Sequence, residues 1–278
     1  MAITAADVNK LRQMTGAGMM DCKKALTEAD GDFEAAVDVL RKQGQKVAAK
    51  RADNVVSEGL VLIHVNNDAT NGKLVAFACE TEPVSKVADF QNMAMNIMSQ
   101  AVASNVQSKE ELLDLPQADG QTLQAHITEL VGKLGEKLEV VSYQNVSSEK
   151  VISYLHSNNK LGVLVAFEGA NGADLDEVGK DVAMQIAAMK PIALDKEDVD
   201  ASVVEREIEV GKELARNEGK AEAMLDKIAL GRLNKFYKES TLLNQEFIKD
   251  SSLTIAQLLQ KTQKGLSVTT FKRVAIGG

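Results

Sequence analysis

The chain has 278 residues, of which 45% are hydrophobic and 26% charged, a composition typical of a folded protein with a sizeable core. Its formal net charge of −8 argues against direct nucleic-acid binding, because contacts with phosphates need clustered lysine and arginine. No apolar run is long enough to span a membrane and the first residues lack a secretion signal, so we expect a cytoplasmic protein that does not contact membranes. The widely separated Cys22 and Cys79 fit two reduced thiols in that compartment.

The first 54 residues predict a bundle of three short helices. Thr4 and Asp32 can cap the first and third helices through their side-chain oxygens, and Gly31 can end the second. The basic segment 46–54 is expected to form a solvated connector to the body of the chain.

The body of the chain contains an internal repeat, in which three segments recur in the same order about 90 residues later. They are "LIHVNN" (62–67) as "YLHSNN" (154–159), "LVAF" (74–77) unchanged at 164–167, and "AMNI" (94–97) as "AMQI" (183–186). Each copy predicts a strand, an asparagine-rich hairpin, a second strand, a loop and a helix. We therefore expect an α+β fold with a pseudo-symmetric core of two repeated units and antiparallel sheets.

The remaining segments predict further helices. Residues 105–140 are expected to be mostly helical, with breaks at Pro116 and Gly120. Two apolar stripes in the charged stretch 200–239 predict an antiparallel helical hairpin, and a short helix and a last strand follow it. We expect four parts: the bundle 1–54, a first core unit 55–141, a second core unit 142–199 with 240–278, and the hairpin 200–239.

The sequence shows little catalytic chemistry. His64 and His156 occupy equivalent repeat positions and could form a metal pair, but no cysteine or carboxylate stands at ligand spacing beside them, so structural histidines are favoured. "TGAGMM" lacks the third glycine of a dinucleotide-binding motif, and no phosphate-binding loop of the GxxxxGK[ST] type occurs. We expect no catalytic residue, metal or cofactor, and a function carried by exposed side chains. A metal- or nucleotide-using enzyme stays an alternative, which a bound metal or nucleotide in the purified protein would support.

The segment "CETEPVSKVADF" (79–90) is the most unusual connection in the chain. It follows an apolar run that predicts a buried strand and precedes a run that predicts a helix. A turn of this kind can hold a few side chains rigidly in solvent, and here it presents Glu82 and Pro83.

Several segments together resemble the translation elongation factor Ts family. The longest is "LRQMTGAGMMDCKKALTEADGD" (11–32), which is close to the opening signature of that family. Others in the same order are "FEAAVDVLRKQG", "KVAAKRADNVVSEGLV", "ETEPVSKVADF", "SYLHSNNKLGVLV", "AMQIAAMKP", "LLNQEFIKD" and "TIAQLL". The resemblance covers essentially the whole chain. It implies a guanine-nucleotide exchange factor that releases GDP from elongation factor Tu and is not an enzyme.

The resemblance also implies a role for the turn after the strand. In the family this connection usually reads T-D-F-V-x-K, and its acidic and aromatic side chains enter elongation factor Tu near the bound magnesium. The matching residues are Thr81, Glu82, Pro83, Val84 and Lys86. Glu82 keeps a carboxylate one methylene longer, whereas Pro83 replaces the aromatic residue. Gln185 is a second departure, because many members carry histidine at that position, where it is thought to support the contact around the loop.

The resemblance further implies that the bundle docks on the GTPase. The exposed candidates are Arg12, Met19, Met20, Lys23 and, in the connector, Arg51. In the competing interpretations, one of the two methionines closes the core of the bundle, and Lys23 and Arg51 are solvated charges. The hairpin 200–239 could touch the partner, mediate a homodimer or simply project.

Two hypotheses follow from these observations. In the first, the chain is an exchange factor in translation. In the second, a three-helix bundle of the ubiquitin-associated type on an α+β scaffold binds elongation factor Tu with weak or no exchange activity, because the turn reads Glu-Pro rather than Asp-Phe. Losing an aromatic side chain from an interface can cost on the order of 2 kcal/mol, which keeps the second hypothesis open.

Overall fold

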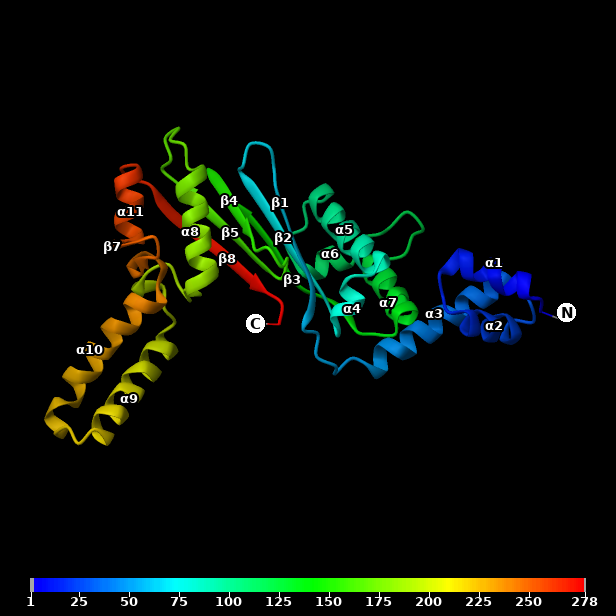
Figure 1. Cartoon of the computed structure of the whole chain (residues 1–278), viewed down its shortest axis with the longest axis horizontal. Helices are drawn as coiled ribbons and strands as arrows, with labels where there is room; N and C mark the ends of the chain where they lie inside the picture. Colours follow the sequence, from blue (N-terminus) through cyan, green and yellow to red (C-terminus); the bar gives the residue numbers. More distant parts are fainter. Residues whose placement is uncertain (1–2, 278) are drawn as a thin grey trace.

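The chain begins with three helices, at one end of an elongated molecule (Figure 1). The computed structural model describes residues 3–277. The helices are α1 (Ala5–Thr15), α2 (Met19–Glu28) and α3 (Phe33–Lys50). Thr4 caps α1 in a reciprocal arrangement with Asp7, and Asp32 accepts a hydrogen bond from the backbone N–H of Ala35 at the start of α3. The predicted three-helix bundle is present, while its assignment to the ubiquitin-associated type stays a prediction.

Helix α3 is longer than the sequence predicts. The expected connector 46–54 is wrong for residues 46–50, because the helix continues to Lys50. Val47 and Ala48 pack against the core of the first sheet and so favour helix over solvated coil there. Gly44 lies against helix α7 (Leu123–Leu134) so closely that a Cβ on Gly132 would stand 2.6 Å from the Gly44 Cα. The helix therefore runs directly from the bundle onto the body.

The first antiparallel sheet has the strand order β1-β2-β3. Its strands are β1 (Glu58–Val65), β2 (Asn71–Cys79) and β3 (Leu138–Ser147), and its helices are α5 (Ala88–Ala103), α6 (Lys109–Leu113) and α7. The sequence analysis did not predict β3, which lies partly in the segment 105–140 that was expected to be mostly helical. The expected division between residues 141 and 142 also falls inside this strand, which pairs with β2 along its whole length.

The second antiparallel sheet repeats the arrangement of the first, with strand order β4-β5-β8. Its strands are β4 (Lys150–Leu155), β5 (Leu161–Glu168) and β8 (Ser267–Ala275), and its helices are α8 (Asp176–Met189) and α11 (Ile255–Thr262). The register shifts between Ala76 and Phe77 in β2 and between Ala166 and Phe167 in β5, at the same place in the repeated "LVAF" segment. The repeat therefore extends to a shared irregularity of the backbone.

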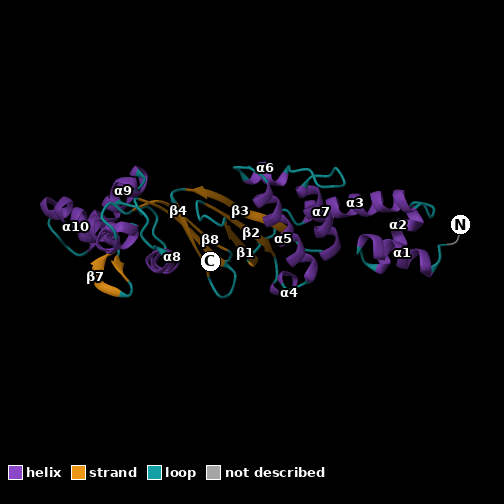
Figure 2. Cartoon of the chain, turned by 90° about the horizontal axis from the view of Figure 1, so that it is seen from above, coloured by secondary structure: helices purple, strands orange, loops and turns teal. Residues whose placement is uncertain are grey.

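The two sheets pack face to face, and the helices cover their outer sides (Figure 2). Leu74 and Ala76 of β2 and Leu164 and Ala166 of β5 are buried in the shared layer. The prediction of an α+β fold with antiparallel sheets is confirmed.

A helical hairpin projects from the second sheet on the side away from the bundle (Figure 1). It consists of α9 (Ala201–Asn217) and α10 (Glu222–Ser240), which pack against each other, with Gly211 close to Ala229. The short elements η1 (Lys196–Asp198), η2 (Leu242–Asn244), β6 (Glu246–Phe247) and β7 (Asp250–Thr254) flank it. Between residues 3 and 277, none of the helices has the length and apolar character needed to cross a membrane.

Candidate functional site

The connection after β2, which was expected to be a strand-to-helix turn, contains a single turn of helix, α4 (Glu82–Ser85). Pro83 lies in the first turn of α4, where a helix has no hydrogen-bond partner for a backbone N–H and proline is therefore tolerated. The Ser85 hydroxyl donates to the carbonyl oxygen of Glu82 at 2.7 Å, and the half-buried Val84 packs against the core of the first sheet. Glu82 and Pro83 are left exposed at the tip.

Glu82 presents an ionised carboxylate to solvent. Its side chain is 62% exposed and forms an ion pair of 2.8 Å with Lys86 one turn later. The hydrogen bond from Lys86, together with its positive charge, holds the pKa of Glu82 below its ordinary value. An ion pair this exposed contributes little to stability, so the carboxylate is free to exchange Lys86 for another cation.

Thr81 is exposed, and both of its hydrogen-bond donors bind the protein itself. Its backbone N–H donates to Glu136 Oε2 at 3.0 Å, and its hydroxyl donates to Glu136 Oε1 at 2.6 Å. The Cys79 thiol donates to the Thr81 carbonyl oxygen at 3.2 Å, and burial raises the pKa of that thiol to about 12. The polar groups of Thr81 hold the start of α4, and its contact with a partner stays a prediction.

Glu80 fixes the same turn from its other side. The Arg51 guanidinium donates to both Glu80 oxygens at 2.9 Å, Asn54 donates at 2.9 Å, and the Lys137 backbone N–H donates at 2.6 Å. Burial alone would raise the pKa of Glu80, but the hydrogen bonds from Lys137, Arg51 and Asn54 hold it below its ordinary value. Arg51 was predicted to contact a partner, and the structure shows its guanidinium bound to Glu80.

The predicted docking residues of the bundle lie on its surface. Arg12 and Lys23 are exposed, and Met19 and Met20 are 47% and 62% exposed. The alternative in which one of the two methionines closes the bundle core is wrong, because that core is made by Val8, Leu11, Cys22, Ala25, Leu26 and Ala36. Met14 is also 60% exposed, although its position on the apolar stripe of α1 predicts a buried side chain.

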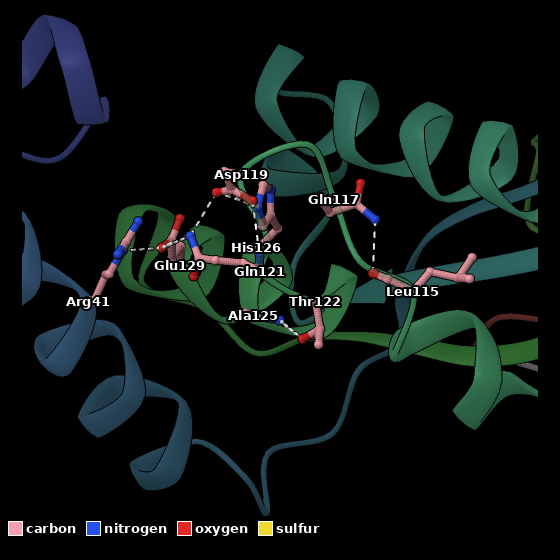
Figure 3. A network of polar contacts seen from close by, with 9 residues as sticks. All are labelled: Arg41, Leu115, Gln117, Asp119, Gln121, Thr122, Ala125, His126 and Glu129. Carbon is pink, nitrogen blue, oxygen red and sulfur yellow. Dashed lines mark hydrogen bonds and ion pairs between the residues drawn. The ribbon is translucent and has the colours of Figure 1, made fainter.

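A polar network fixes the bundle to the body (Figure 3). Arg41 of α3 pairs with Glu129 of α7 at 2.8 Å, and Gln121 donates to the same carboxylate at 3.3 Å and to Asp119 at 2.9 Å. Hydrogen bonds from Gln121 and from His126 lower the pKa of Asp119 to about 2. The network therefore connects α3 to α7 and to the segment before α7.

Gln185 is 1% exposed and is not brought beside the α4 turn. It lies on α8, over the second sheet, whereas α4 packs on β1 and β2 of the first (Figure 1). Its amide nitrogen donates to Gln245 and to the carbonyl oxygen of Glu246, and its amide oxygen accepts from the backbone N–H of Ile248. In this chain the position holds the segment 245–248 on α8.

The histidines and cysteines are separate from one another. His156 shares a hydrogen bond of 2.8 Å with Tyr154, His126 pairs with Asp119, and both cysteines are buried and unpaired. Within residues 3–277 no group of three or more His, Cys, Asp or Glu side chains could hold a metal ion.

These features define the class of protein, an α+β scaffold that holds a short turn with an exposed carboxylate. Comparison with known proteins gives the family. The profile described as "Elongation factor TS" matches residues 80–278. The elongation factor Ts of Cytophaga hutchinsonii is 64% identical over 274 residues, which cover 99% of each chain. Those of Amoebophilus asiaticus and Porphyromonas gingivalis are 55% and 48% identical, with 100% and 99% of each chain covered. The chain belongs to the elongation factor Ts family.

Proposed function

We propose that this protein is a guanine-nucleotide exchange factor that releases GDP from elongation factor Tu during polypeptide elongation in the cytoplasm. It docks on the GDP-bound GTPase and places the exchange loop, residues 81–84, near the magnesium and phosphate site. The observation that carries this proposal is the exposed carboxylate of Glu82 on a turn fixed from both sides by Glu80 and Glu136. No covalent bond is made or broken by the protein, so it is not an enzyme.

Exchange rests on reciprocal coupling between two binding sites. The factor and the nucleotide each bind the GTPase, and each lowers the affinity of the GTPase for the other by the same factor. A nucleotide bound at nanomolar affinity is held by about 12 kcal/mol, and weakening it a thousandfold requires a coupling of about 4 kcal/mol. Several contacts between the bundle, the exchange loop and the GTPase can share that amount.

The carboxylate supplies the electrostatic part of the mechanism. Magnesium is a hard cation that prefers oxygen ligands in a strict geometry, so an intruding carboxylate disturbs its coordination. Glu82 reaches further than aspartate by one methylene and gives up only an exposed ion pair with Lys86 when it does so. Lys86 is then free to face the partner.

Pro83 supplies rigidity where an aromatic residue would supply buried area. Proline has a fixed φ and few side-chain conformers, so little entropy is lost when it is ordered at an interface. The exposed Arg12, Met19, Met20 and Lys23 supply docking area at the bundle. In this proposal the bundle 1–54 docks, the two core units hold the loop, and the hairpin 200–239 remains a separate part that is available for self-association.

Stopped-flow release of a fluorescent GDP analogue from elongation factor Tu tests the proposal. We expect the wild-type chain to accelerate release well above the spontaneous rate, and Glu82→Ala to lose most of that acceleration. The double change Glu82→Asp with Pro83→Phe restores the family pattern and is expected to release GDP at least as fast as the wild type.

Spontaneous release with the wild type, together with rescue by the double change, would instead support a binder without exchange activity. Full-length identity to elongation factors Ts gives that alternative no support.

A further inference from the structure

The exchange loop projects into solvent, yet its first residue is held by a side chain from another part of the chain. Glu136 lies in the turn between α7 and β3, 55 positions after Thr81, and takes both of its donors. We propose that Glu136 is a positioning residue for the exchange loop, a role that rests on the function proposed above. Glu136 holds Thr81 and does not itself touch the partner.

The geometry of the contact fixes both the backbone and the side chain of Thr81. One carboxylate oxygen accepts from the backbone N–H at 3.0 Å, and the other accepts from the hydroxyl at 2.6 Å. Hydrogen bonds to an ionised acceptor are shorter and stronger than neutral ones. A two-point contact of this kind sets the direction in which the chain enters α4, and so the direction in which Glu82 and Pro83 point.

Glu136 is itself fixed by its neighbours. Gly135 ends α7 in the left-handed conformation with φ +73°, and Leu138, the first residue of β3, pairs with Cys79. Between them, the Lys137 backbone N–H donates to Glu80, and its ammonium group donates to the carbonyl oxygens of Ala52 and Asn54 at 2.8 and 3.1 Å. Residues 136–138 therefore run beside residues 79–81 on a framework that also includes the end of the docking bundle.

This arrangement separates docking from loop insertion. Removing the Glu136 carboxylate frees Thr81 but leaves the Arg51–Glu80 contact and the exposed face of the bundle in place. The affinity of the factor for the GTPase is then largely kept, while the loop no longer enters in one orientation. Small misplacements of groups that act at a reaction centre can cost about a hundredfold in rate.

The test compares three variants with the wild type in GDP release at increasing factor concentration. We expect Glu136→Ala to lower the maximum release rate by about tenfold to a hundredfold with little change in the half-saturating concentration. Thr81→Val, which removes only the hydroxyl donor, is expected to have a smaller effect in the same direction.

Glu149→Ala is the matched control. Glu149 accepts hydrogen bonds from the backbone N–H groups of Gly169 and Asn171 and so makes the same kind of contact at the corresponding connection of the second sheet. We expect this variant to keep the wild-type maximum rate.

Hydrogen exchange of the backbone amides gives a second readout that does not depend on elongation factor Tu. We expect the peptide covering residues 80–86 to exchange faster in Glu136→Ala and, to a smaller degree, in Thr81→Val than in the wild type or Glu149→Ala. Unchanged amide exchange and an unchanged maximum rate in a folded Glu136→Ala protein would overturn the proposal. If the wild type releases no GDP, the proposed function fails, whereas the amide exchange still reports whether Glu136 orders the loop.

Discussion

Glu80 is a nearly buried carboxylate whose charge is used inside the protein, and this makes it a source of acid sensitivity. Its folded pKa lies below its ordinary value, so the native state binds fewer protons than the unfolded state. The stability that it contributes is present above about pH 4.5 and is lost as the pH falls through its folded pKa. We expect Glu80→Gln to lower the free energy of unfolding by about 1–3 kcal/mol at pH 7 and by much less under acidic conditions.

Urea unfolding at pH 7 and at pH 4 measures this difference. Glu168→Gln is the matched control, because Glu168 is an exposed carboxylate at the end of β5. If Glu80→Gln lost the same amount of stability at both pH values, the stabilising role of the ionised Glu80 carboxylate would be contradicted.

For single residues, sequence reasoning identified the exposed tip of the site but not the side chains that hold it. Glu82 and Pro83 could be predicted because an acid and a proline between an apolar strand and a helix are unusual in themselves. The hydrogen bonds of Thr81 and Arg51 could not, since they depend on Glu136 and Glu80, which are distant from them in the sequence. The burial of Gln185 likewise depends on the segment 245–248, about 60 residues later.

Helix α3 meets α7 at two glycines, and this close contact attaches the bundle to the body. A Cβ on Gly132 would stand 2.6 Å from the Gly44 Cα, which is backbone and cannot move aside alone. We expect Gly132→Ala to lower the free energy of unfolding by about 1–3 kcal/mol through overpacking and to raise the half-saturating concentration in GDP release.

Gly231→Ala in α10 provides the control for this prediction. A Cβ there would meet no atom within 4 Å, so the change should raise stability by up to about 1 kcal/mol, because alanine favours helix over glycine. Chemical denaturation measures the free energy of unfolding of both variants and so tests this prediction. Equal stabilisation by the two changes would show that α3 and α7 separate at no cost.

Elements inside the repeat could be predicted from the sequence, whereas the strand that completes the first sheet is harder to see. The two strands and the following helix of each unit carry matching segments, which located β1, β2, α5, β4, β5 and α8. The third strand of the first sheet, β3, has no matching segment, and in "LEVVSYQNVS" polar residues interrupt the apolar ones. It forms because β2 offers a free edge, along which Val140 and Tyr143 pack toward the helices and Val146 packs toward the second sheet.

The whole molecule places its two helical extensions at opposite ends, with the exchange loop between them (Figure 1). The bundle is fixed to the first sheet by the α3–α7 contact, the Arg41–Glu129 pair and the Arg51–Glu80 pair. Within residues 3–277 the hairpin makes no comparable contact with the first sheet. It is carried by the segments around Ala193 and Thr241 beside the second sheet. The part of the molecule that holds the loop is therefore distinct from the part that carries the hairpin.

This separation predicts that the hairpin can be removed without loss of the exchange step. The segments before and after it already meet, because Ala193 and Thr241 form a β-bridge and the backbone N–H groups of Leu242 and Leu243 donate to the carbonyl oxygens of Ala193 and Leu194. Packed helices lie about 8–10 Å apart, so a linker of about four Gly and Ser residues can join Asp200 to Thr241. We expect the shortened chain to fold and to keep its maximum GDP release rate within about twofold, because Glu80, Thr81 and Glu136 are untouched.

Release measured over a range of factor concentrations, together with light scattering of the free factor, distinguishes the roles that are open to the hairpin. A higher half-saturating concentration with an unchanged maximum rate would assign it to docking. A dimer that becomes a monomer on removal would assign it to self-association, and no change in either would leave it as a projecting element. A large fall in the maximum rate of the shortened, folded chain would contradict the separation itself, because it would mean that the orientation of the exchange loop depends on an element at the far end of the molecule.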